Sequence, residues 1–401
     1  MKWYKSWNYL SVDYQTTIGT VADLTQRTWF RNNLRGDAVR LFFSNQYSSE
    51  KLEIAGVSVG KMKGGVLTDL QKAAFGGRKE LVLQPGESCS SDELALSVKE
   101  GEEIVVSCYF EKENVIRAAA TTWSCGSWHT SYGSGDQTAE TMIAEEKSCG
   151  DIYPYIGSAP ISCDVVIGLT EIWVRSEQKV VETALFGDSI THMSYYSDQL
   201  AELLYERFPG QTVVTNKGYG GNRLLRDASW IPDVDGHGAN AGKAGLQRFE
   251  GDVYGSSSPE IVCVLEGTND LMHPYFFKRM EELPETEELS AGMQKLAAMA
   301  HQHGSKVMVG TVPPMLEGEY AFGEVGEKRR NEYNSWVLSW DGCDGALNFA
   351  EALANPEKKE LMAEGLHIGD GLHPNLEGGR TMSKIAYEKC AECIEALLTE
   401  K

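Results

Sequence analysis

The stretch Thr183-Ala184-Leu185-Phe186-Gly187-Asp188-Ser189-Ile190 joins an apolar run to a Gly-Asp-Ser turn. The run predicts a buried strand, and the turn predicts a junction between this strand and a helix. At such a junction the hydroxyl of Ser189 is exposed at the strand end, and its backbone N–H lies near a helix N-terminus. The simpler alternative is that Ser189 only caps the helix.

Strands and helices alternate from this stretch to the C-terminus. Expected strands cover residues 183–186, 212–215, 261–265, 306–312 and 346–349, and expected helices cover residues 197–208, 241–254, 287–303, 327–340 and 378–398. This alternation predicts a parallel sheet with helices on both faces, which is a three-layer αβα fold. Functional residues of such sheets gather beyond the carboxyl ends of the strands.

A base and an acid occur near the C-terminus in Asp370-Gly371-Leu372-His373. A serine hydroxyl becomes a good nucleophile when a base takes its proton and a carboxylate orients that base. The spacing of three residues, in a loop that ends at Pro374, allows the carboxylate to fold back onto the imidazole. We therefore predict Ser189 as the nucleophile, His373 as the base and Asp370 as the orienting acid. The alternative is a buried, hydrogen-bonded histidine without a catalytic role.

Two segments between these motifs, residues 216–223 and 267–270, are candidates for stabilising an oxyanion. Gly221 follows the second expected strand and would present its N–H without a side chain in the way. Asn269 follows the third strand and would offer its side-chain amide, beside the N–H of Ser189. The alternatives are a turn-forming glycine with positive φ and an asparagine that shapes a turn.

Three more residues near these motifs are candidates for contact with a substrate. Asp188 and His192 flank Ser189 closely in sequence, and Arg223 follows Gly221 by two residues. Arg223 is also a candidate for clamping its own loop. None of the three belongs to a recognisable metal-binding pattern.

The first 175 residues have a different texture from the rest of the chain. Short runs of β-branched and aromatic residues at 38–44, 52–59 and 104–110 are separated by Gly-rich breaks. They predict an all-β domain, a β-sandwich or jelly roll, over residues 1–175, before an αβα domain over residues 176–401. This first domain is either a buttress, which we prefer, or a sugar-binding module that uses aromatic residues such as Trp123 and Trp128.

Composition excludes several classes of partner. The chain has 401 residues and a formal net charge of −21, which argues against nucleic acid and against anionic lipid as partners. A neutral substrate such as a sugar ester would not be repelled. The N-terminal residues show no apolar core of signal-peptide length, and no stretch is long enough to span a bilayer, so we expect a cytoplasmic protein.

Cysteine usage agrees with a reducing compartment, because nine cysteines form an odd number without framework spacing. Cys390 and Cys393 form a CxxC, but they lie in an expected helix without a second pair, and a chance spacing is preferred over a redox or zinc site. The chain contains no HExxH motif. We therefore expect neither a metal nor a cofactor.

The four motifs, taken in order, resemble the SGNH (GDSL-type) hydrolase superfamily. The matching blocks are Gly187-Asp188-Ser189, Gly221, Gly267-x-Asn269-Asp270 and Asp370-x-x-His373. The resemblance implies a flavodoxin-like αβα domain that hydrolyses esters through a Ser189–His373–Asp370 triad. It also implies an oxyanion hole formed by Ser189, Gly221 and Asn269, and chemistry without a cofactor.

A narrower resemblance covers most of the chain. Segments 40–45, 75–78 and 83–87 are similar to the β-sandwich that precedes the catalytic domain in xylan-esterase-like members of this superfamily. Segments 222–227, 248–253 and 265–270 resemble the same members. The resemblance implies removal of acyl groups, often acetyl, from carbohydrates such as xylo- or manno-oligosaccharides. This chain departs from that branch at His192-Met193, which affects the expected pocket wall.

Two other functions remain open from the sequence. One is a general short-chain esterase or lysophospholipase, which acyl-length dependence would separate from a sugar deacetylase. The other is a carbohydrate-binding protein whose hydrolase domain is a relic, because fold and motif do not guarantee activity. The sequence makes no prediction of the oligomeric state.

Overall fold

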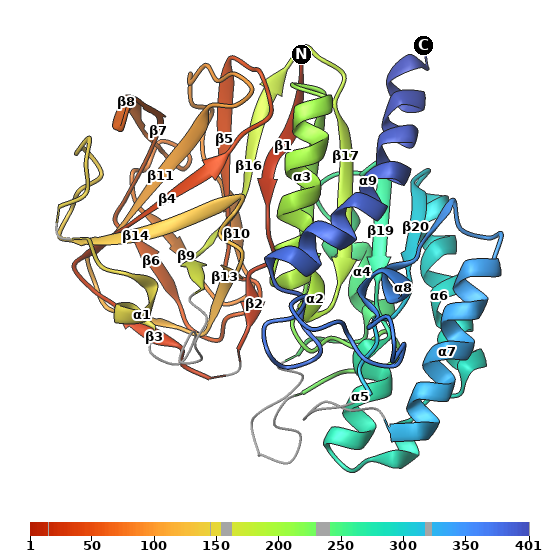
Figure 1. The fold of residues 1–401 in the computed structure, drawn as a ribbon. Helices are drawn as coiled ribbons and strands as arrows, with labels where there is room; N and C mark the ends of the chain where they lie inside the picture. Colours follow the sequence, from red (N-terminus) through yellow and green to blue (C-terminus); the bar gives the residue numbers. More distant parts are fainter. Residues whose placement is uncertain (15, 145, 154–162, 230–240, 317–322, 401) are drawn as a thin grey trace. The chain divides into compact units, whose positions relative to one another are not determined.

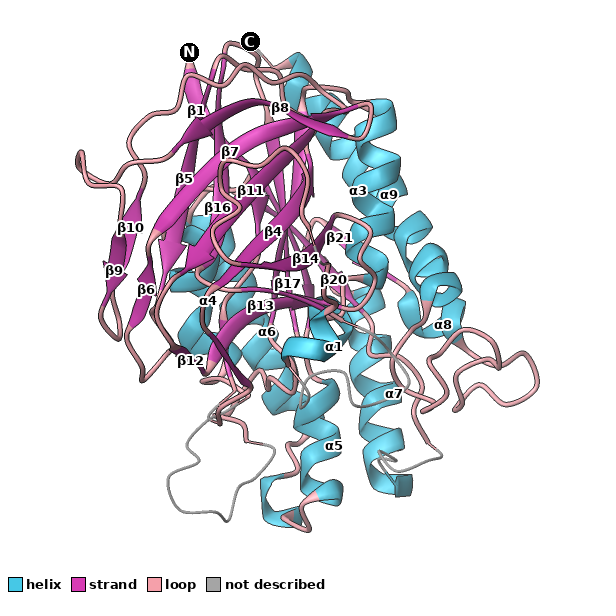
Figure 2. Ribbon diagram, turned by 90° about the vertical axis from the view of Figure 1, so that its left-hand side faces the viewer, coloured by secondary structure: helices cyan, strands magenta, loops and turns pink. Residues whose placement is uncertain are grey.

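The computed structural model describes residues 1–14, 16–144, 146–153, 163–229, 241–316 and 323–400. The chain forms two compact units. The first comprises Met1–Val180 with Tyr205–Val213, and the second comprises Val181–Leu204 with Val214–Lys401. Strands dominate the first unit, and the second combines strands with helices (Figures 1 and 2).

A five-stranded sheet forms the centre of the second unit. Its strands, in spatial order, are β18 (Thr212–Gly218), β17 (Val181–Gly187), β19 (Ile261–Leu265), β20 (Lys306–Gly310) and β21 (Gly345–Leu347). The pairs β17/β19, β19/β20 and β20/β21 are parallel. In chain order this is 2-1-3-4-5, the doubly wound order of flavodoxin-like sheets, so the predicted αβα fold is confirmed.

Helices pack on the sheet in two groups. In one group α4 packs on α6, α6 on α7 and α7 on α5, and in the other α3 and α8 pack on α9. Every residue of β17 and of β19 is buried, as expected for a parallel sheet that is covered on both faces. The helices after residue 181 are α2 (Ser189–His192), α3 (Tyr195–Arg207), α4 (Gly245–Tyr254), α5 (Thr268–Phe276), α6 (Thr286–Gln302), α7 (Gly323–Ser339), α8 (Phe349–Leu353) and α9 (Leu376–Thr399), with a 3-10 turn η1 (Met280–Glu282).

Several predicted boundaries in this unit differ from the structure by a few residues, and two of the differences have a clear physical cause. The expected strand 346–349 ends at Leu347, because Asn348 caps α8 by accepting the N–H of Glu351, and Phe349 is already helical. The expected helix 241–254 begins only at Gly245, since Gly242 has φ +83° and lies outside helical geometry.

The first unit is built on two antiparallel sheets. One has the order β1 (Lys2–Asn8), β16 (Leu169–Ser176), β5 (Ala38–Ser44) and β10 (Ser88–Ser90). The other has the order β14 (Trp128–Ser134), β4 (Leu24–Arg31), β11 (Glu103–Phe110), β7 (Gly56–Lys63) and β8 (Val66–Lys72). Apolar side chains of both sheets, such as Val39, Ile172, Phe30 and Ile104, share one core, which is consistent with the predicted β-sandwich.

Smaller elements complete this unit, and one of them corrects a prediction. The expected strand 52–59 is two strands, because Leu52–Ile54 (β6) pairs with β9 whereas β7 pairs with β11 and β8. The remaining elements are β2 (Val12–Asp13), β3 (Gly19–Val21), β9 (Leu81–Leu83), β12 (Asn114–Ile116), β13 (Ala118–Thr122), β15 (Asp164–Val166) and α1 (Cys149–Ile152).

The aromatic residues that were candidates for a sugar platform lie at this core. Trp128 is only 1% exposed, and its ring packs edge-on against Trp7 and Tyr9 at centroid distances of 5.8 and 5.5 Å. Trp123 is partly buried against the same core. A ring that is covered in this way has no free face for a sugar, so Trp128 stabilises the sandwich.

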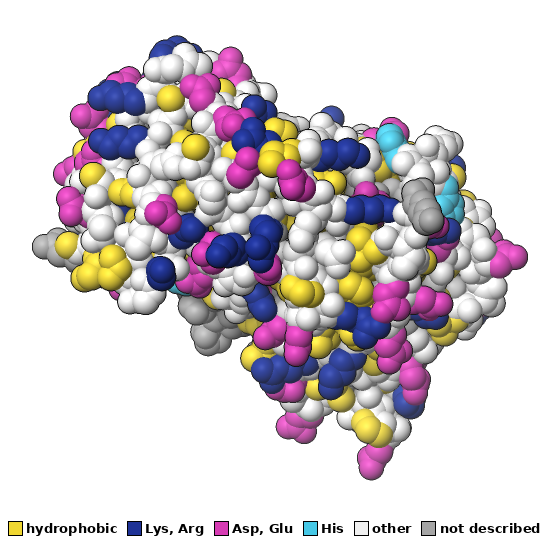
Figure 3. Space-filling model, turned by 90° about the horizontal axis from the view of Figure 1, so that it is seen from above, with side chains coloured by type: hydrophobic (Ala, Val, Ile, Leu, Met, Phe, Trp, Pro, Cys, Tyr) yellow, Lys and Arg dark blue, Asp and Glu magenta, His cyan; other side chains and the backbone are white. Residues whose placement is uncertain are grey.

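Charged side chains of both signs are interspersed on the molecular face shown in Figure 3. In the part of the chain that the structure describes, no helix is long and apolar enough to cross a membrane.

Candidate active site

Ser189 is the first residue of α2, and only Asp188 separates it from the strand β17. Asp188 caps this helix, since its Oδ1 accepts the N–H of Ile190 at 2.9 Å. The N–H of Ser189 has no carbonyl one turn earlier in the helix to bond to, as is general for a first helical residue. Strand end and cap therefore present both the hydroxyl and the N–H of Ser189 at the rim of the sheet.

His373 connects Ser189 to Asp370. Its Nε2 lies 2.8 Å from Ser189 Oγ, and its Nδ1 lies 2.6 Å from Asp370 Oδ2. Burial alone would raise the pKa of Asp370, but its hydrogen bond with His373 and the His373 charge, with two backbone N–H groups, hold it at about 2. The carboxylate is therefore ionised at neutral pH and orients the ring. The three side chains that the sequence analysis paired form one hydrogen-bonded chain.

The loop that carries His373 is ordered by its own polar contacts. His367 Nδ1 accepts the N–H groups of Gly369 and Gly371 at 3.0 and 3.1 Å. Asn375 caps α9 and donates to the carbonyl of His367 at 3.0 Å. The imidazole of His373 is thus held between a turn and a capped helix.

The two other oxyanion candidates meet in the loop after β18. Gly221 has φ +76°, a left-handed conformation that favours glycine, and no acceptor of its N–H is found among the described residues. Asn269 lies in the first turn of α5, is 1% exposed, and donates one Nδ2 hydrogen to the carbonyl of Asn222 at 2.8 Å. A carboxamide has a second N–H, which remains for an oxyanion.

His192 has a different environment from the predicted substrate contact. Its ring is buried, and its Nδ1 accepts the N–H of Gly220 at 3.1 Å. Burial, helped by the charge of Arg248, lowers the pKa of His192 to about 4, so the ring is neutral. A Cβ at Gly218 would lie 2.2 Å from the backbone nitrogen of His192. The side chain of His192 therefore links α2 to the loop that contains Gly220.

The side chain of Asp188, the second predicted substrate contact, is fully buried. Burial raises the pKa of Asp188 to about 6, although the N–H of Ile190 and the charge of His373 act in the opposite direction. In the structure Asp188 is the cap of α2. Arg223, the third predicted contact, is buried and forms an ion pair with Glu282, with Nη1 2.6 Å from Oε2.

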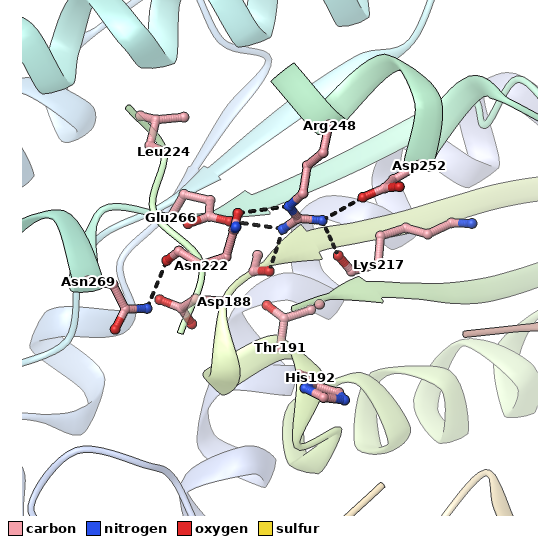
Figure 4. A network of polar contacts seen from close by, with 12 residues as sticks. Asp188, Thr191, His192, Lys217, Asn222, Leu224, Arg248, Asp252, Glu266 and Asn269 are labelled. Carbon is pink, nitrogen blue, oxygen red and sulfur yellow. Dashed lines mark hydrogen bonds and ion pairs between the residues drawn. The ribbon is translucent and has the colours of Figure 1, made fainter. Parts of the chain in front are cut away.

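Arg248, on α4, is a residue that the sequence analysis did not single out. Its guanidinium donates to the carbonyl of Gly187 at 2.9 Å, to the carbonyl of Lys217 at 3.1 Å and to the side chain of Asn222 at 2.7 Å (Figure 4). These three acceptors lie at the end of β17, at the end of β18 and in the loop after β18. We call this loop, which carries Gly221, the oxyanion loop after its proposed role. One side chain therefore joins the chain segments that carry Ser189 and Gly221.

Two acids balance the charge of Arg248. Asp252 accepts from Nη1 at 2.9 Å, and Glu266, at the end of β19, accepts from Nη2 at 3.2 Å (Figure 4). Burial raises the pKa of Glu266 well above its usual range, and the charge of Arg248 opposes this. The spacing of Arg248 and Asp252, four residues apart on one helix, is the signal in the sequence that could have indicated this pair.

Asp270 is a second residue whose contacts at this site were not predicted from the sequence. Its carboxylate accepts the N–H of Leu224 at 2.7 Å and that of Leu225 at 3.0 Å. The start of α5 therefore holds the oxyanion loop through Asp270 as well as through Asn269. Within the described ranges, no group of three or more His, Cys, Asp or Glu side chains is placed to hold a metal ion.

Comparison with known proteins identifies the domain that contains this site. Residues 185–380 match the model of the GDSL-like lipase/acylhydrolase family. No curated protein matches the chain.

Solved structures that resemble the chain do so over about half of it. A catalytic mutant of Axe2, an acetylxylan esterase from Geobacillus stearothermophilus, is 17% identical with a TM-score of 0.40, over 54% of this chain and 96% of that one. An acylhydrolase from Bacteroides fragilis described as putative is 16% identical with a TM-score of 0.38, over 54% and 88%. A protein of the G-D-S-L family from Desulfitobacterium hafniense, also described as putative and lipolytic, is 18% identical with a TM-score of 0.37, over 52% and 99%.

These structural likenesses are too distant to indicate what the chain acts on. The family match covers the strand that precedes Ser189, the oxyanion loop, α5 and the loop of His373. Residues 185–380 therefore form a GDSL-like lipase/acylhydrolase domain, which is a domain of an ester-hydrolase family.

Proposed function

We propose that the protein is a serine esterase that removes short acyl groups, acetyl above all, from carbohydrate through an acyl-enzyme. The observation that carries the proposal is the unbroken contact from Ser189 Oγ to His373 Nε2, 2.8 Å, and from His373 Nδ1 to Asp370 Oδ2, 2.6 Å. A hydrogen-bonded series of serine, histidine and carboxylate activates the serine hydroxyl at neutral pH.

In the proposed mechanism Ser189 attacks the ester carbonyl while His373 takes the hydroxyl proton. Asp370 keeps the ring oriented and stabilises the imidazolium that forms. The oxyanion of the tetrahedral intermediate is bound by the N–H groups of Ser189 and Gly221 and by the amide of Asn269. His373 then gives its proton to the leaving alcohol. A water molecule, deprotonated by His373, releases the acid in a second cycle.

The proposed substrate is an acetylated oligosaccharide of the xylo or manno type. Support comes from the sequence segments that resemble xylan-esterase-like proteins, and from the net charge of −21, which does not repel a neutral sugar. We propose neither nucleic acid nor a membrane as a partner.

Residues 1–175 are proposed to be an accessory domain without catalytic residues. Every residue of the proposed catalytic machinery lies in the second unit, between Gly187 and His373. The burial of Trp128 favours a structural role over sugar binding through this ring.

Mass spectrometry of acetylated xylo- and manno-oligosaccharides, before and after incubation, tests the proposal. Loss of acetyl units with the parent enzyme, and none with Ser189→Ala, is the expected result. A series of aryl esters with increasing acyl length should show a sharp fall beyond acetyl. Equal rates on long acyl chains would favour a lipid esterase, and sugar binding without hydrolysis would favour a relic domain.

A further inference from the structure

Arg223 is a buried cation with donors that the protein leaves unused. Its side chain is only 5% exposed, and Nη1 donates to Glu282 Oε2 at 2.6 Å. Its Nε and Nη2 are buried and have no hydrogen-bond partner among the described residues. A guanidinium presents its N–H donors in a fixed fork, and buried donors without acceptors are unfavourable. An acceptor that is not part of the chain would relieve this cost.

The position of Arg223 is fixed by α5. The carbonyl of Asn222, just before it, accepts from Asn269, and the N–H of Leu224, just after it, donates to Asp270 at 2.7 Å. Both neighbours of Arg223 are therefore tied to the helix turn that carries the proposed oxyanion donor.

Arg223 is adjacent in the chain to a residue that contacts this donor, since Asn269 donates to the carbonyl of Asn222 at 2.8 Å. His273 follows Asn269 by four residues, so the two side chains share a face of α5. Burial and then the charge of Arg223 lower the pKa of His273 to about 3, so the ring is neutral. A group bound by Arg223 would thus lie near a carbonyl bound at Asn269.

The charges around Arg223 indicate which kind of acceptor fits. Glu282 already pairs with the guanidinium, and Asp270 is a second acid whose pKa burial raises and the Arg223 charge lowers. A substrate carboxylate would meet both acids. A neutral oxygen, such as a hydroxyl or a ring oxygen, would accept from Nε and Nη2 without added repulsion.

We propose that Nε and Nη2 of Arg223 bind a neutral oxygen of the alcohol portion of the substrate, so that Arg223 selects esters of polyhydroxylated rings. An acetyl group has no oxygen beyond its carbonyl, which is why the acceptor belongs to the alcohol. This inference rests on the proposed esterase function and deepens it, since it assigns a specificity-determining residue to the same site.

Two acetates of equal ring size test the proposal: a monoacetate of methyl xylopyranoside and cyclohexyl acetate. Both are measured with the parent enzyme, with Arg223→Met and with Arg226→Met. Arg226 is an exposed arginine in the same segment and serves as the matched control. We expect Arg223→Met to lower kcat/KM for the xyloside ester roughly 10- to 100-fold, as for lost hydrogen bonds to a charged group. The value for cyclohexyl acetate should change by less than about threefold, and Arg226→Met should alter neither.

An equal loss on both esters in Arg223→Met would overturn the proposal, because it would show a purely structural role. If this variant does not fold, the test uses the parent enzyme instead. Its kcat/KM is then compared across a series of ring monoacetates, each of which lacks one hydroxyl. A drop of about tenfold for at least one missing hydroxyl supports the proposal, and equal kcat/KM across the series overturns it. Hydrolysis of neither ester by the parent enzyme is a different result, since it refutes the esterase function itself.

Discussion

Arg27 in the first unit and Arg248 in the second are both buried, and they hold different parts of the chain. Arg27, on β4, is 1% exposed and donates to Ser107 Oγ and to the carbonyls of Gln137 and Glu140, each at 2.8 Å. Arg248, on α4, is almost as buried, but its acceptors lie at the ends of two strands and in the loop next to Ser189.

Burial of a charged side chain therefore does not by itself indicate function. Both side chains satisfy carbonyls that would otherwise lack donors, and burial lowers the pKa of Arg27 without giving it chemistry. What differs is the acceptors. Arg27 joins a loop to a sheet, whereas Arg248 joins the chain segments that carry Ser189 and Gly221. Four predictions test whether this distinction holds.

The largest effect is expected from His373. Replacing it by alanine should lower kcat by roughly 10⁴-fold or more, because Ser189 loses its base. Replacing His367, which orders the same loop, is the comparison variant and should cost far less. Steady-state kinetics on a short acetyl ester measure both, and a His373→Ala enzyme within tenfold of the parent would contradict the assignment.

Asn269 is expected to rank second. Asn269→Ala should lower kcat by about 10²- to 10³-fold with a much smaller change in KM, since its amide is proposed to bind charge that develops only in the transition state. A change confined to KM would instead indicate ground-state binding. Circular dichroism should show the parent fold, although the carbonyl of Asn222 loses its donor.

Replacing Arg248 should mainly lower activity, whereas replacing Arg27 should mainly lower stability. Arg248→Met should lower kcat by roughly 10- to 100-fold, because displacement of about 1 Å between Ser189 and the oxyanion loop costs that much. Arg27→Met should leave kcat within about twofold but lower the free energy of unfolding by about 2–4 kcal/mol, since two carbonyls lose their donor. Kinetics and denaturant unfolding on both variants make the test. A fall in kcat for Arg27→Met equal to that for Arg248→Met would remove the distinction.

Asp188 should show the smallest effect, and only as a function of pH. Its folded pKa of about 6 lies above its usual 3.8, so its contribution to stability is present below pH 3.8 and is lost as the pH rises through 6. The difference corresponds to roughly 3 kcal/mol. Asp188→Asn keeps the helix cap, and its free energy of unfolding relative to the parent should improve between pH 4 and pH 7.

Glu266 and Asp270, whose pKa values burial also raises, titrate in the same direction as Asp188, so the difference between variant and parent is the quantity to measure. Asp341→Asn, at an exposed acid, is the control variant. A parent-minus-variant difference that is flat from pH 4 to pH 7 would contradict the raised pKa.

Sequence was a good guide wherever the signal was local. The apolar run before Gly187 predicted β17, and the position of Ser189 after it followed from the strand end. Asp370 and His373 were paired because three residues of loop allow the contact that the structure shows. The αβα order followed from the alternation of elements.

Contacts between distant segments were not predictable in this way. Arg248 meets residues 26 to 61 positions away, and no periodicity marks such partners. His192 looked like a pocket residue because it is close to Ser189 in sequence, but the close approach of Gly218 buries it. Phe349 has strand propensity, yet the cap at Asn348 starts a helix there.

The central claim, that Ser189 is a nucleophile activated through His373 and Asp370, is tested most directly with a fluorophosphonate probe and peptide mass spectrometry. We predict one adduct per chain, on the peptide that contains Ser189, absent in Ser189→Ala and formed much more slowly in His373→Ala. An adduct on another residue, or ester hydrolysis by Ser189→Ala at the parent rate, would contradict the account.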